Sequence, residues 1–393
     1  RDREEDIEHI RQIADRERAP FYVVGETTGD HRFVFEQTDG VKPIDLAMED
    51  MFGKAPRTVM SDRTVEETYE DVTYDQTQLD EYVERVLQLE AVACKDWLTN
   101  KVDRSVTGKI ARQQCQGEIQ LPLSDCGVVA LDYRGRAGIA TSIGHAPQAA
   151  LVAPAAGSVL SIAEALTNIV WAPLSEGLDS VSLSANWMWP CKNEGEDARL
   201  YRAVEACSDF ACSLGINIPT GKDSLSMTQK YGKDKVYSPG TVIISAGAEV
   251  SDIRKVVSPV LRTGIDSTVY YIDFSFDKLK LGGSAFAQSL DKIGKEVPTV
   301  QDSEYFANAF NAVQELINKE LILAGHDISA GGMITTMLEM NFANTEGGLE
   351  VSLDEIPEKD LVKILFSENP GILIQVEKTD EVEKILKKAG VAF

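Results

Sequence analysis

The stretch GSVLSIAEALTN, residues 157–168, decides how this sequence is interpreted, because it combines a helix signal with metal-ligand chemistry. Pro154 and Gly157 are expected to end the preceding segment, and Ser158 is the expected N-cap. Apolar residues then recur at every third or fourth position. This spacing predicts a helix over residues 158–170 with one face against a core.

Glu164 and Asn168 stand four residues apart in this predicted helix, so their side-chain oxygens share one face. A carboxylate and an amide in that arrangement suit a hard cation such as Mg²⁺. Most such pairs simply face solvent. The pair therefore indicates a metal site only if other parts of the chain supply further ligands.

Composition limits the class of protein. The 393 residues suffice for two or three domains, and 43% hydrophobic with 26% charged residues is typical of a globular protein. The formal net charge of −24 argues against binding to nucleic acid or anionic membranes. Six cysteines without a CxxC pair indicate reduced thiols and a cytoplasmic location. We find no signal peptide or membrane-spanning run, and Arg1 within a charged helical run suggests a piece of a longer protein.

The hydrophobic patterns predict a mixed α/β chain in four parts. Residues 1–55 hold too few elements for a domain, and the acidic residues 56–78 are expected to form a linker. Residues 79–252 and 255–393 each combine helices with strands. The predicted helices are 1–19, 82–99, 158–170, 197–214, 303–319, 331–342 and 379–389, and the predicted strands are 21–25, 31–37, 128–131, 139–142, 181–183, 241–250, 268–274, 321–326 and 371–376.

Two segments carry candidate ligands at the ends of predicted strands. HDISAGG, residues 326–332, ends a strand and opens a helix, so its backbone N–H groups suit an anion and Asp327 suits a metal. A plain glycine-rich turn is the alternative. In LSDCG, residues 123–127, Asp125 is either a ligand or a turn residue. Cys126 is interpreted as a small buried thiol rather than a nucleophile.

Two further segments invite phosphate binding. PTGKDS, residues 219–224, fails as a P-loop because its leading glycine is misplaced and an aspartate replaces Ser or Thr. We expect a loop in which Lys222, Asp223 and Ser224 contact phosphate or metal, or else a plain turn. Arg104 suits phosphate recognition, with a solvated strand edge as the alternative.

Six motifs in order resemble the large form of phosphoribosylformylglycinamidine synthase, the FGAR amidotransferase of purine biosynthesis. They are DRSVTG (103–108), EALTN (164–168), SANW (184–187), GEDA (195–198), IPTGKDSLSM (218–227) and HDISAGG (326–332). Residues 16–26 and 42–54 resemble the segment that closes the first half of that enzyme. The resemblance therefore covers essentially the whole chain. SANW and GKDSLSM together argue against a related thiamine-phosphate kinase or selenophosphate synthetase.

The resemblance implies an α+β fold of the aminoimidazole-ribonucleotide-synthetase-like superfamily, in which each half has an N-type and a C-type domain. Residues 1–55 would be the tail of the first C-type domain. Residues 79–252 would be the second N-type, ATP-binding-like domain, and residues 255–393 the second C-type domain. The first N-type domain and the glutaminase domain of the same polypeptide would be missing partners.

The implied chemistry is that of a C–N bond-forming ligase, with FGAR, ATP and glutamine as substrates. ATP phosphorylates the formyl-amide oxygen of FGAR, and ammonia from glutamine displaces phosphate to give FGAM. The resemblance assigns Mg²⁺ binding to Asp125, Glu164, Asn168 and Asp327. It assigns nucleotide contacts to Ser124, Ser329, Gly331 and Gly332, although the family often has Ala where Ser124 stands.

The resemblance also implies that this Mg–ADP site is auxiliary and retains ADP without turnover. The catalytic histidine and the glycine-rich phosphate loop would lie in the missing N-type domain, so the catalytic residues and the FGAR contacts are unknown here. The chain is therefore expected to be inactive alone. The alternative is a purely structural half that binds no nucleotide.

Overall fold

The computed structural model describes all residues except 1–2, 55–58, 95–96, 98–103 and 105–107. Backbone contacts divide the chain into two compact units, Arg1–Met60 and Ser61–Phe393. Among the described residues, no helix combines the length and the apolar character needed to cross a lipid bilayer.

The first unit consists of one helix, one hairpin and a short second helix. Its elements are η1 (Glu4–Asp6), α1 (Ile7–Arg16), β1 (Arg32–Phe35), β2 (Ile44–Ala47) and α2 (Met48–Phe52), and the two strands pair antiparallel. None of its described residues is buried. The predicted helix and the predicted strand 31–37 are confirmed. The predicted strand 21–25 is wrong, because this segment pairs with no other described strand and its backbone groups face water.

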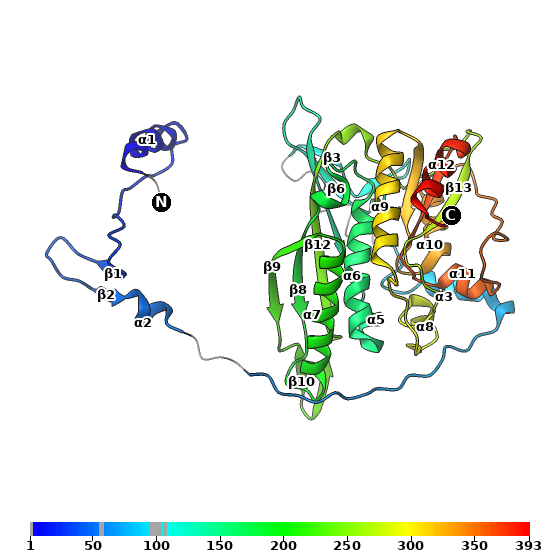
Figure 1. Ribbon diagram of the computed structural model, residues 1–393, viewed down its shortest axis with the longest axis horizontal. Coiled ribbons are helices and arrows are strands. Elements are labelled where there is room, and N and C mark those ends of the chain that lie inside the picture. The colour runs from blue at the N-terminus through cyan, green and yellow to red at the C-terminus, as the bar shows by residue number, and fades with distance from the viewer. Residues whose placement is uncertain (1–2, 55–58, 95–96, 98–103, 105–107) are drawn as a thin grey trace. The chain divides into compact units, whose positions relative to one another are not determined.

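The second unit begins with a six-stranded sheet, called the first sheet below (Figure 1). In spatial order its strands are β3 (Ile110–Arg112), β6 (Gly127–Ala130), β7 (Gly138–Gly144), β12 (Thr241–Val250), β8 (Ser182–Met188) and β9 (Asn217–Ser224). Neighbours are antiparallel except β8 and β9. Helices α6 (Pro154–Ile169) and α7 (Glu196–Ser213) lie against one face and bury Ile162 and Leu166. On β7, buried residues alternate with exposed ones such as Ile143.

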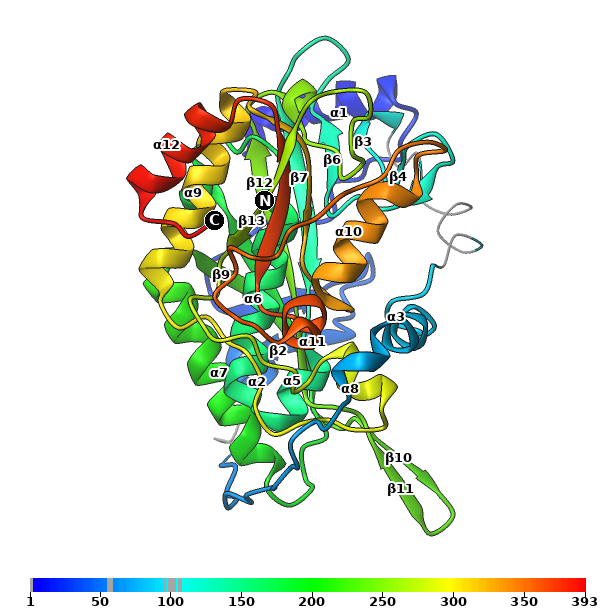
Figure 2. The ribbon, with the colours of Figure 1, turned by 90° about the vertical axis from the view of Figure 1, so that its right-hand side faces the viewer.

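The second unit also contains several short elements. They are η2 (Gln76–Gln78), α3 (Leu79–Leu87), β4 (Cys115–Gln116), β5 (Leu121–Pro122), α5 (Pro147–Val152), η4 (Gly177–Ser180), β10 (Thr228–Tyr231), β11 (Asp234–Tyr237) and η5 (Ile253–Lys255). Figure 2 shows the β10–β11 hairpin projecting away from the helices and sheets of this unit.

The C-terminal part forms a three-stranded antiparallel sheet, called the second sheet, with helices on both faces. Its strands, in order, are β13 (Thr268–Asp273), β15 (Gly371–Val376) and β14 (Ile322–Asp327). The helices are α8 (Ala285–Ser289), α9 (Ser303–Asn318), α10 (Gly332–Phe342), α11 (Leu361–Phe366) and α12 (Thr379–Ala389). One face packs with α9 and α12, and the other with α10 and α11. Every residue of the central strand β15 is buried, which explains why it is apolar apart from Gln375, whose side-chain amide donates to the carbonyl of Arg262, at 2.9 Å.

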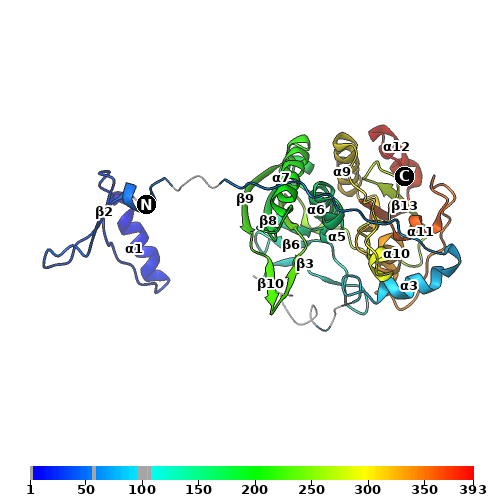
Figure 3. The same cartoon turned by 90° about the horizontal axis from the view of Figure 1, so that it is seen from below.

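Helices α6 and α7 lie between the first sheet and the elements of the second sheet (Figure 3). Phe210 of α7 meets Phe306 of α9 edge to face, with ring centroids 5.7 Å apart. Buried Gln314 of α9 donates to the carbonyls of Val170 and Ala172, at 2.6 and 3.0 Å. A single hydrophobic core thus spans both sheets, and the predicted division near residue 252 stays a prediction. The mixed α/β class is confirmed.

The helix that carries Glu164 starts earlier than expected. Helix α6 begins at Pro154, whose missing N–H is not needed in the first turn. Ser158 is therefore not the N-cap; its hydroxyl lies inside the helix and donates to the carbonyls of Pro154 and Ala203. Gly157 does not break the helix, because a Cβ there would lie 2.6 Å from the Cα of Ala150 in α5. The glycine permits close packing of two helices.

Two other predictions are corrected by the fold. The predicted loop 219–224 belongs to the edge strand β9, which extends by pairing in parallel with β8. The predicted helix 82–99 ends at Leu87, where turns replace it over residues 88–93. Most of its remaining residues lie outside the described part of the chain.

The predicted linker has no helix or strand between residues 59 and 75, yet it is anchored to the second unit. The carboxylate of Asp62 accepts the backbone N–H groups of Gly195 and Asp197 at the start of α7, at 3.2 and 3.1 Å. Farther along, the hydroxyl of Tyr74 donates to Asp360, at 2.6 Å. These contacts fix the path of the segment along the protein surface.

Candidate metal and nucleotide site

Asp125, His326 and Asp327 form a buried cluster where the two sheets meet. Nδ1 of His326 lies 2.7 Å from Oδ1 of Asp125 and 3.4 Å from Oδ1 of Asp327. Nε2 of the same ring lies 3.0 Å from Oε2 of Glu339. The side chains of Asp125 and Asp327 are only 4% and 3% exposed. The structure thus brings together two of the four predicted metal ligands, from segments about 200 residues apart in the sequence.

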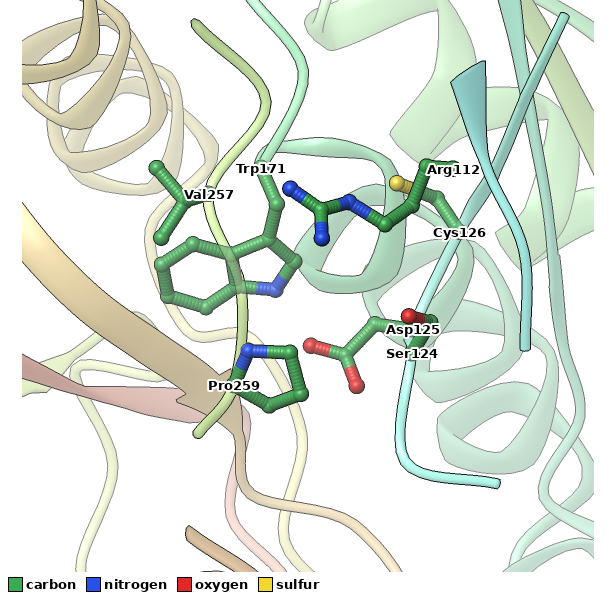
Figure 4. A pocket seen from close by; sticks show the side chains of 7 residues that line it. All are labelled: Arg112, Ser124, Asp125, Cys126, Trp171, Val257 and Pro259. Atoms are coloured by element: carbon green, nitrogen blue, oxygen red, sulfur yellow. The ribbon is translucent and has the colours of Figure 1, made fainter. Parts of the chain in front are cut away.

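Both aspartates are held by neighbouring elements. Asp125 directly precedes β6, and Asp327 is the last residue of β14. The hydroxyl of Thr336 on α10 donates to the backbone carbonyl of Asp327, at 2.8 Å. Figure 4 shows the Asp125 carboxylate directed into the space that Trp171 and Pro259 line. These supports place the cluster on strand ends rather than on a mobile loop.

Burial and mutual charge shift the pKa values of all three residues of the cluster. Burial raises the pKa of Asp125, and burial together with the charge of Asp125 raises the pKa of Asp327 well above its usual range. Burial by itself lowers the pKa of His326, but Asp125 and Glu339 outweigh it and raise this pKa well above its usual value. The Oδ2 atoms of Asp125 and Asp327 are buried without a hydrogen-bond partner. Such orphaned oxygens are suited to a metal ion.

Glu164 and Asn168 share one face of α6, as their spacing predicts. Oε2 of Glu164 accepts the backbone N–H of His145, at 2.7 Å, and Nδ2 of Asn168 donates to the carbonyl of Ile143, at 2.9 Å. Both residues therefore hold the end of β7 and the residue that follows it against α6. The charge of Glu164 also contributes to the raised pKa of Asp327, which places this carboxylate near the cluster.

The turn after β14 is shaped by two glycines and one carboxylate. Gly331 and Gly332 have φ angles of +96° and +75°, in the region that L-residues rarely occupy. Oε1 of Glu368 accepts the N–H groups of Gly331 and Ala285, at 2.8 and 2.7 Å. The N–H of Gly332 donates to the carbonyl of Ser329, at 3.0 Å. Gly331 is one of the predicted nucleotide contacts, but its N–H already donates to the carboxylate of Glu368.

Burial raises the pKa of Glu368 to about 7. An unfolded glutamate ionises near pH 4.5, so the unfolded chain loses this proton first as the pH rises, and stability falls between pH 4.5 and 7. We expect Glu368→Gln to remove this fall, which is worth at most about 3 kcal/mol. Urea unfolding followed by tryptophan fluorescence, in EDTA, measures the difference between variant and wild type across that range.

The control for this measurement is Glu350→Gln, which changes an exposed carboxylate. Its unfolding free energy should run parallel to that of the wild type over the whole pH range. A Glu368→Gln curve that also runs parallel would contradict the raised pKa.

A small cavity adjoins Asp125. Arg112, Ser124, Asp125, Cys126 and Trp171 line it together with Val257 and Pro259, and it encloses about 170 Å³ of empty volume. Nε of Arg112, Oγ of Ser124 and Nε1 of Trp171 are buried there without a hydrogen-bond partner. Cys126 is buried, and burial raises its pKa to about 12, so the prediction of a small buried thiol is confirmed.

The remaining candidate residues lie elsewhere. Nε of Arg104 donates to Oε1 of Gln113, at 2.9 Å, while Asp103 and residues 105–107 of the same motif lie outside the described residues. Lys222 and Ser224 contact each other on β9, an outer strand of the first sheet. None of the contacts of the described residues joins Lys222, Asp223 or Ser224 to the Asp125 cluster.

Three charged residues of the site were not predicted from the sequence. His326 precedes a predicted ligand at the end of an apolar strand, which is a signal that could have been used. Glu339 lies 13 residues further on in a helix, and Glu368 precedes a strand in a different segment. No spacing rule connects these two carboxylates with the cluster, because tertiary folding alone brings them there.

The donor atoms fit a divalent cation. Asp125 and Asp327 supply hard carboxylate oxygens, two of them without a partner, and Glu164 adds a third carboxylate nearby. Mg²⁺ is usually bound by one or two carboxylates and completes its shell with water and phosphate oxygens. The residues present therefore suit Mg²⁺ bridging to a phosphate.

Comparisons with known proteins agree with this architecture. Residues 94–249 match the family of FGAR-AT PurM N-like domains, and residues 268–393 match the C-terminal domain of AIR synthase related proteins. The phosphoribosylformylglycinamidine synthase of Dictyostelium discoideum is 36% identical over 98% of this chain, and that of Homo sapiens is 37% identical over 97%. The chain spans about 30% of the length of each of these relatives.

Solved structures show the same fold at low sequence identity. T. maritima PurL complexed with FGAR superposes with a TM-score of 0.56 at 14% identity, covering 88% of this chain and 50% of that chain. T. maritima PurL complexed with ADP gives 0.54 at 12% identity, with coverage of 88% and 48%. The expected fold class is confirmed. By sequence and by fold, this chain is a homologue of the large phosphoribosylformylglycinamidine synthases and contains their PurM-like N-type and AIR-synthase-related C-type domains.

Proposed function

We propose that this chain is part of an FGAM synthase, which converts FGAR to FGAM with ATP and glutamine in purine biosynthesis. Within that enzyme, this part holds Mg–ADP in an auxiliary site formed by Asp125, Glu164, Asn168 and Asp327. It is inactive alone, because the segments with the catalytic residues and the glutaminase are needed for turnover. A cytoplasmic location belongs to the same proposal.

One observation carries the nucleotide part of this proposal. Asp125 precedes a strand of the first sheet and Asp327 ends a strand of the second, yet their carboxylates meet one imidazole at 2.7 and 3.4 Å. Both keep a buried oxygen without a hydrogen-bond partner. His326 compensates part of this buried negative charge, and a cation bound to the two oxygens without partners would compensate the rest. The N–H groups of Gly331 and Gly332 in the adjacent turn already donate to Glu368 and to the carbonyl of Ser329, so a phosphate bound there would displace at least one of these bonds.

A second candidate function is a structural half that binds no nucleotide by itself. Two observations favour it. The space beside Asp125 does not admit even a water-sized sphere, whereas small-molecule pockets usually measure about 300–1,000 Å³. The N–H of Gly331 is also already bound by Glu368. On this view, the site opens only when the rest of the enzyme is present.

A calorimetric titration of ADP, with and without Mg²⁺, separates the two candidates. We expect Mg²⁺-dependent binding of ADP to the chain, and its loss in Asp125→Ala, because this variant removes a cation ligand. The control Asp209→Ala changes an exposed aspartate on α7 and should bind as the wild type does. Absence of binding to the wild type would favour the structural half.

The enzymatic part is tested with the full-length polypeptide that contains this chain. Supplied with FGAR, ATP and glutamine, it should form FGAM, whereas the 393-residue chain alone should form none. Failure of the full-length polypeptide to form FGAM would overturn the proposed activity. FGAM formation by the chain alone would show that the catalytic residues lie within it.

A further inference from the structure

His326 lies between the two aspartates in the geometry of a metal ligand. One ligand atom from each of Asp125, His326 and Asp327 can be chosen so that all lie within 4.8 Å of one another. Around an octahedral ion with bonds of about 2.1 Å, adjacent ligand atoms lie about 3.0 Å apart. The distances of 2.7 and 3.4 Å from Nδ1 of His326 to the two carboxylates bracket this spacing.

The orientation of the imidazole is set from its far side. Nε2 of His326 lies 3.0 Å from Oε2 of Glu339, a residue of α10. A carboxylate that accepts from the outer nitrogen of a histidine is the usual support of a metal-binding imidazole, because it leaves the other nitrogen free to bind the ion. In the structure, Nδ1 of His326 faces Oδ1 of Asp125 at 2.7 Å, and Oδ2 of Asp125 and of Asp327 are buried without a hydrogen-bond partner.

The ligands belong to well-supported backbone. His326 pairs with Leu373 in the ladder between β14 and β15, and the ring of His326 is buried. Gly325, its neighbour, packs directly against buried Trp171. Nδ1 of His326 and two carboxylate oxygens without hydrogen-bond partners are therefore held close together on this backbone. This is the arrangement expected of a preformed site rather than of an incidental acidic cluster.

We infer that Asp125, His326 and Asp327 form a binding site for a first-row transition dication, with Nδ1 of His326 as a ligand and Glu339 as its support. An imidazole in the ligand set favours such ions over Mg²⁺, which prefers oxygen ligands only. The site shares two aspartates with the proposed Mg–ADP site, so the inference deepens that proposal. It does not require Glu164, Asn168 or a bound nucleotide.

Mn²⁺ is the probe of choice, because the exposed thiols of Cys94 and Cys212 would bind softer ions such as Zn²⁺. Electron paramagnetic resonance of Mn²⁺ titrated into the 393-residue chain, without nucleotide, gives the affinity. Electron spin-echo modulation then reports a coordinated imidazole nitrogen directly. We expect one tightly bound Mn²⁺ per chain, with ¹⁴N modulation in its spin-echo signal.

In His326→Gln, the ¹⁴N modulation should vanish and the Mn²⁺ affinity should fall by more than about tenfold. The Mg²⁺ affinity, measured by competition with Mn²⁺, should change little. In Glu339→Gln, the affinity should fall by about tenfold while the modulation remains, since only the support is altered. His9→Gln, on the exposed helix α1, is the matched control and should leave both unchanged.

Bound Mn²⁺ without ¹⁴N modulation in the wild type would overturn the inference and leave His326 as an ion-pair partner of Asp125. Equal losses of Mn²⁺ and Mg²⁺ affinity in His326→Gln would also overturn it, because a purely structural role of His326 would affect the binding of both ions. If His326→Gln does not fold, the wild-type modulation and Glu339→Gln still decide. Mn²⁺ binding with ¹⁴N modulation but without ADP binding would refute the Mg–ADP proposal alone.

Discussion

Asp327→Asn is expected to stabilise the metal-free chain and at the same time to abolish its Mg²⁺-dependent binding of ADP. The carboxylate of Asp327 is buried beside Asp125, with one oxygen lacking a hydrogen-bond partner. Its pKa is raised well above the usual range. The chain therefore loses stability as the pH rises above the pKa of an unfolded aspartate, because the unfolded chain then loses this proton first. An amide removes the charge but keeps the shape.

The two effects have different sizes. Relief of the unpaired buried group should raise the unfolding free energy at neutral pH by about 2 kcal/mol. Loss of a metal ligand should weaken Mg–ADP binding by more than about 100-fold, since changes to outer-shell partners alone cost about 10- to 100-fold. Urea unfolding in EDTA measures the first, and calorimetry with ADP and Mg²⁺ measures the second.

The control is Asp354→Asn, which neutralises an exposed aspartate and should change neither quantity. A destabilised metal-free Asp327→Asn would mean that the carboxylate is required by the fold itself. Gain of stability together with loss of binding is the result expected of a functional site, where a strained group is kept for the ligand it binds.

Gly325→Ala is expected to destabilise the second unit by about 3 kcal/mol, at the upper end for an overpacked core. A Cβ at this position would lie 2.6 Å from Cη2 of Trp171, and the indole ring is itself only 2% exposed. The backbone cannot yield easily, because the N–H of Gly325 donates to the carbonyl of Ser258, at 3.0 Å. Urea unfolding followed by circular dichroism measures the loss.

Gly247→Ala is the matched control, because this strand glycine has its nearest neighbour 4.0 Å from the new Cβ. It should cost little. Combining Gly325→Ala with Trp171→Phe should recover part of the lost stability, since the smaller ring makes room for the methyl group. Equal losses in the two glycine variants, or no recovery in the pair, would show that contact with the indole is not the cause.

The same contact connects stability with the site. Gly325 immediately precedes His326 and Asp327, and Trp171 lines the cavity beside Asp125. A shift of β14 that accommodates the added methyl group would therefore move the two residues most central to the cluster. We expect the Gly325→Ala variant to lose Mg²⁺-dependent ADP binding even under conditions in which it remains folded.

Local sequence was sufficient where an element depends on its own residues. The helix 379–389 and the strands 241–250 and 371–376 match α12, β12 and β15 in their bounds, because a long apolar period identifies them without help from neighbours. Of the proposed ligands, Asp125 and Asp327 were named from motifs of a known family; Asp125 precedes an apolar strand and Asp327 ends one. Glu164 and Asn168 share a face because helical geometry requires it.

Other features depended on contacts between distant segments. Residues 219–224 form a strand only because β8 offers an edge, and residues 21–25 form none because no partner strand lies beside them among the described residues. Ser158 lies inside α6, not at its start, because α5 packs against Gly157 and α6 begins at Pro154. In each case the local pattern was compatible with two structures, and packing selected one.

The sequence by itself determined the mixed α/β class, most of the helices and strands, and two carboxylates of the site. Only the tertiary structure decided that His326, Glu339 and Glu368 join those carboxylates, since they come from a strand, a helix and a turn with no common spacing. Hydrophobic burial joins the two sheets into one core, and this leaves the charged side chains where the sheets meet without access to water. The cost of that burial is the physical reason for the cation site that we propose there.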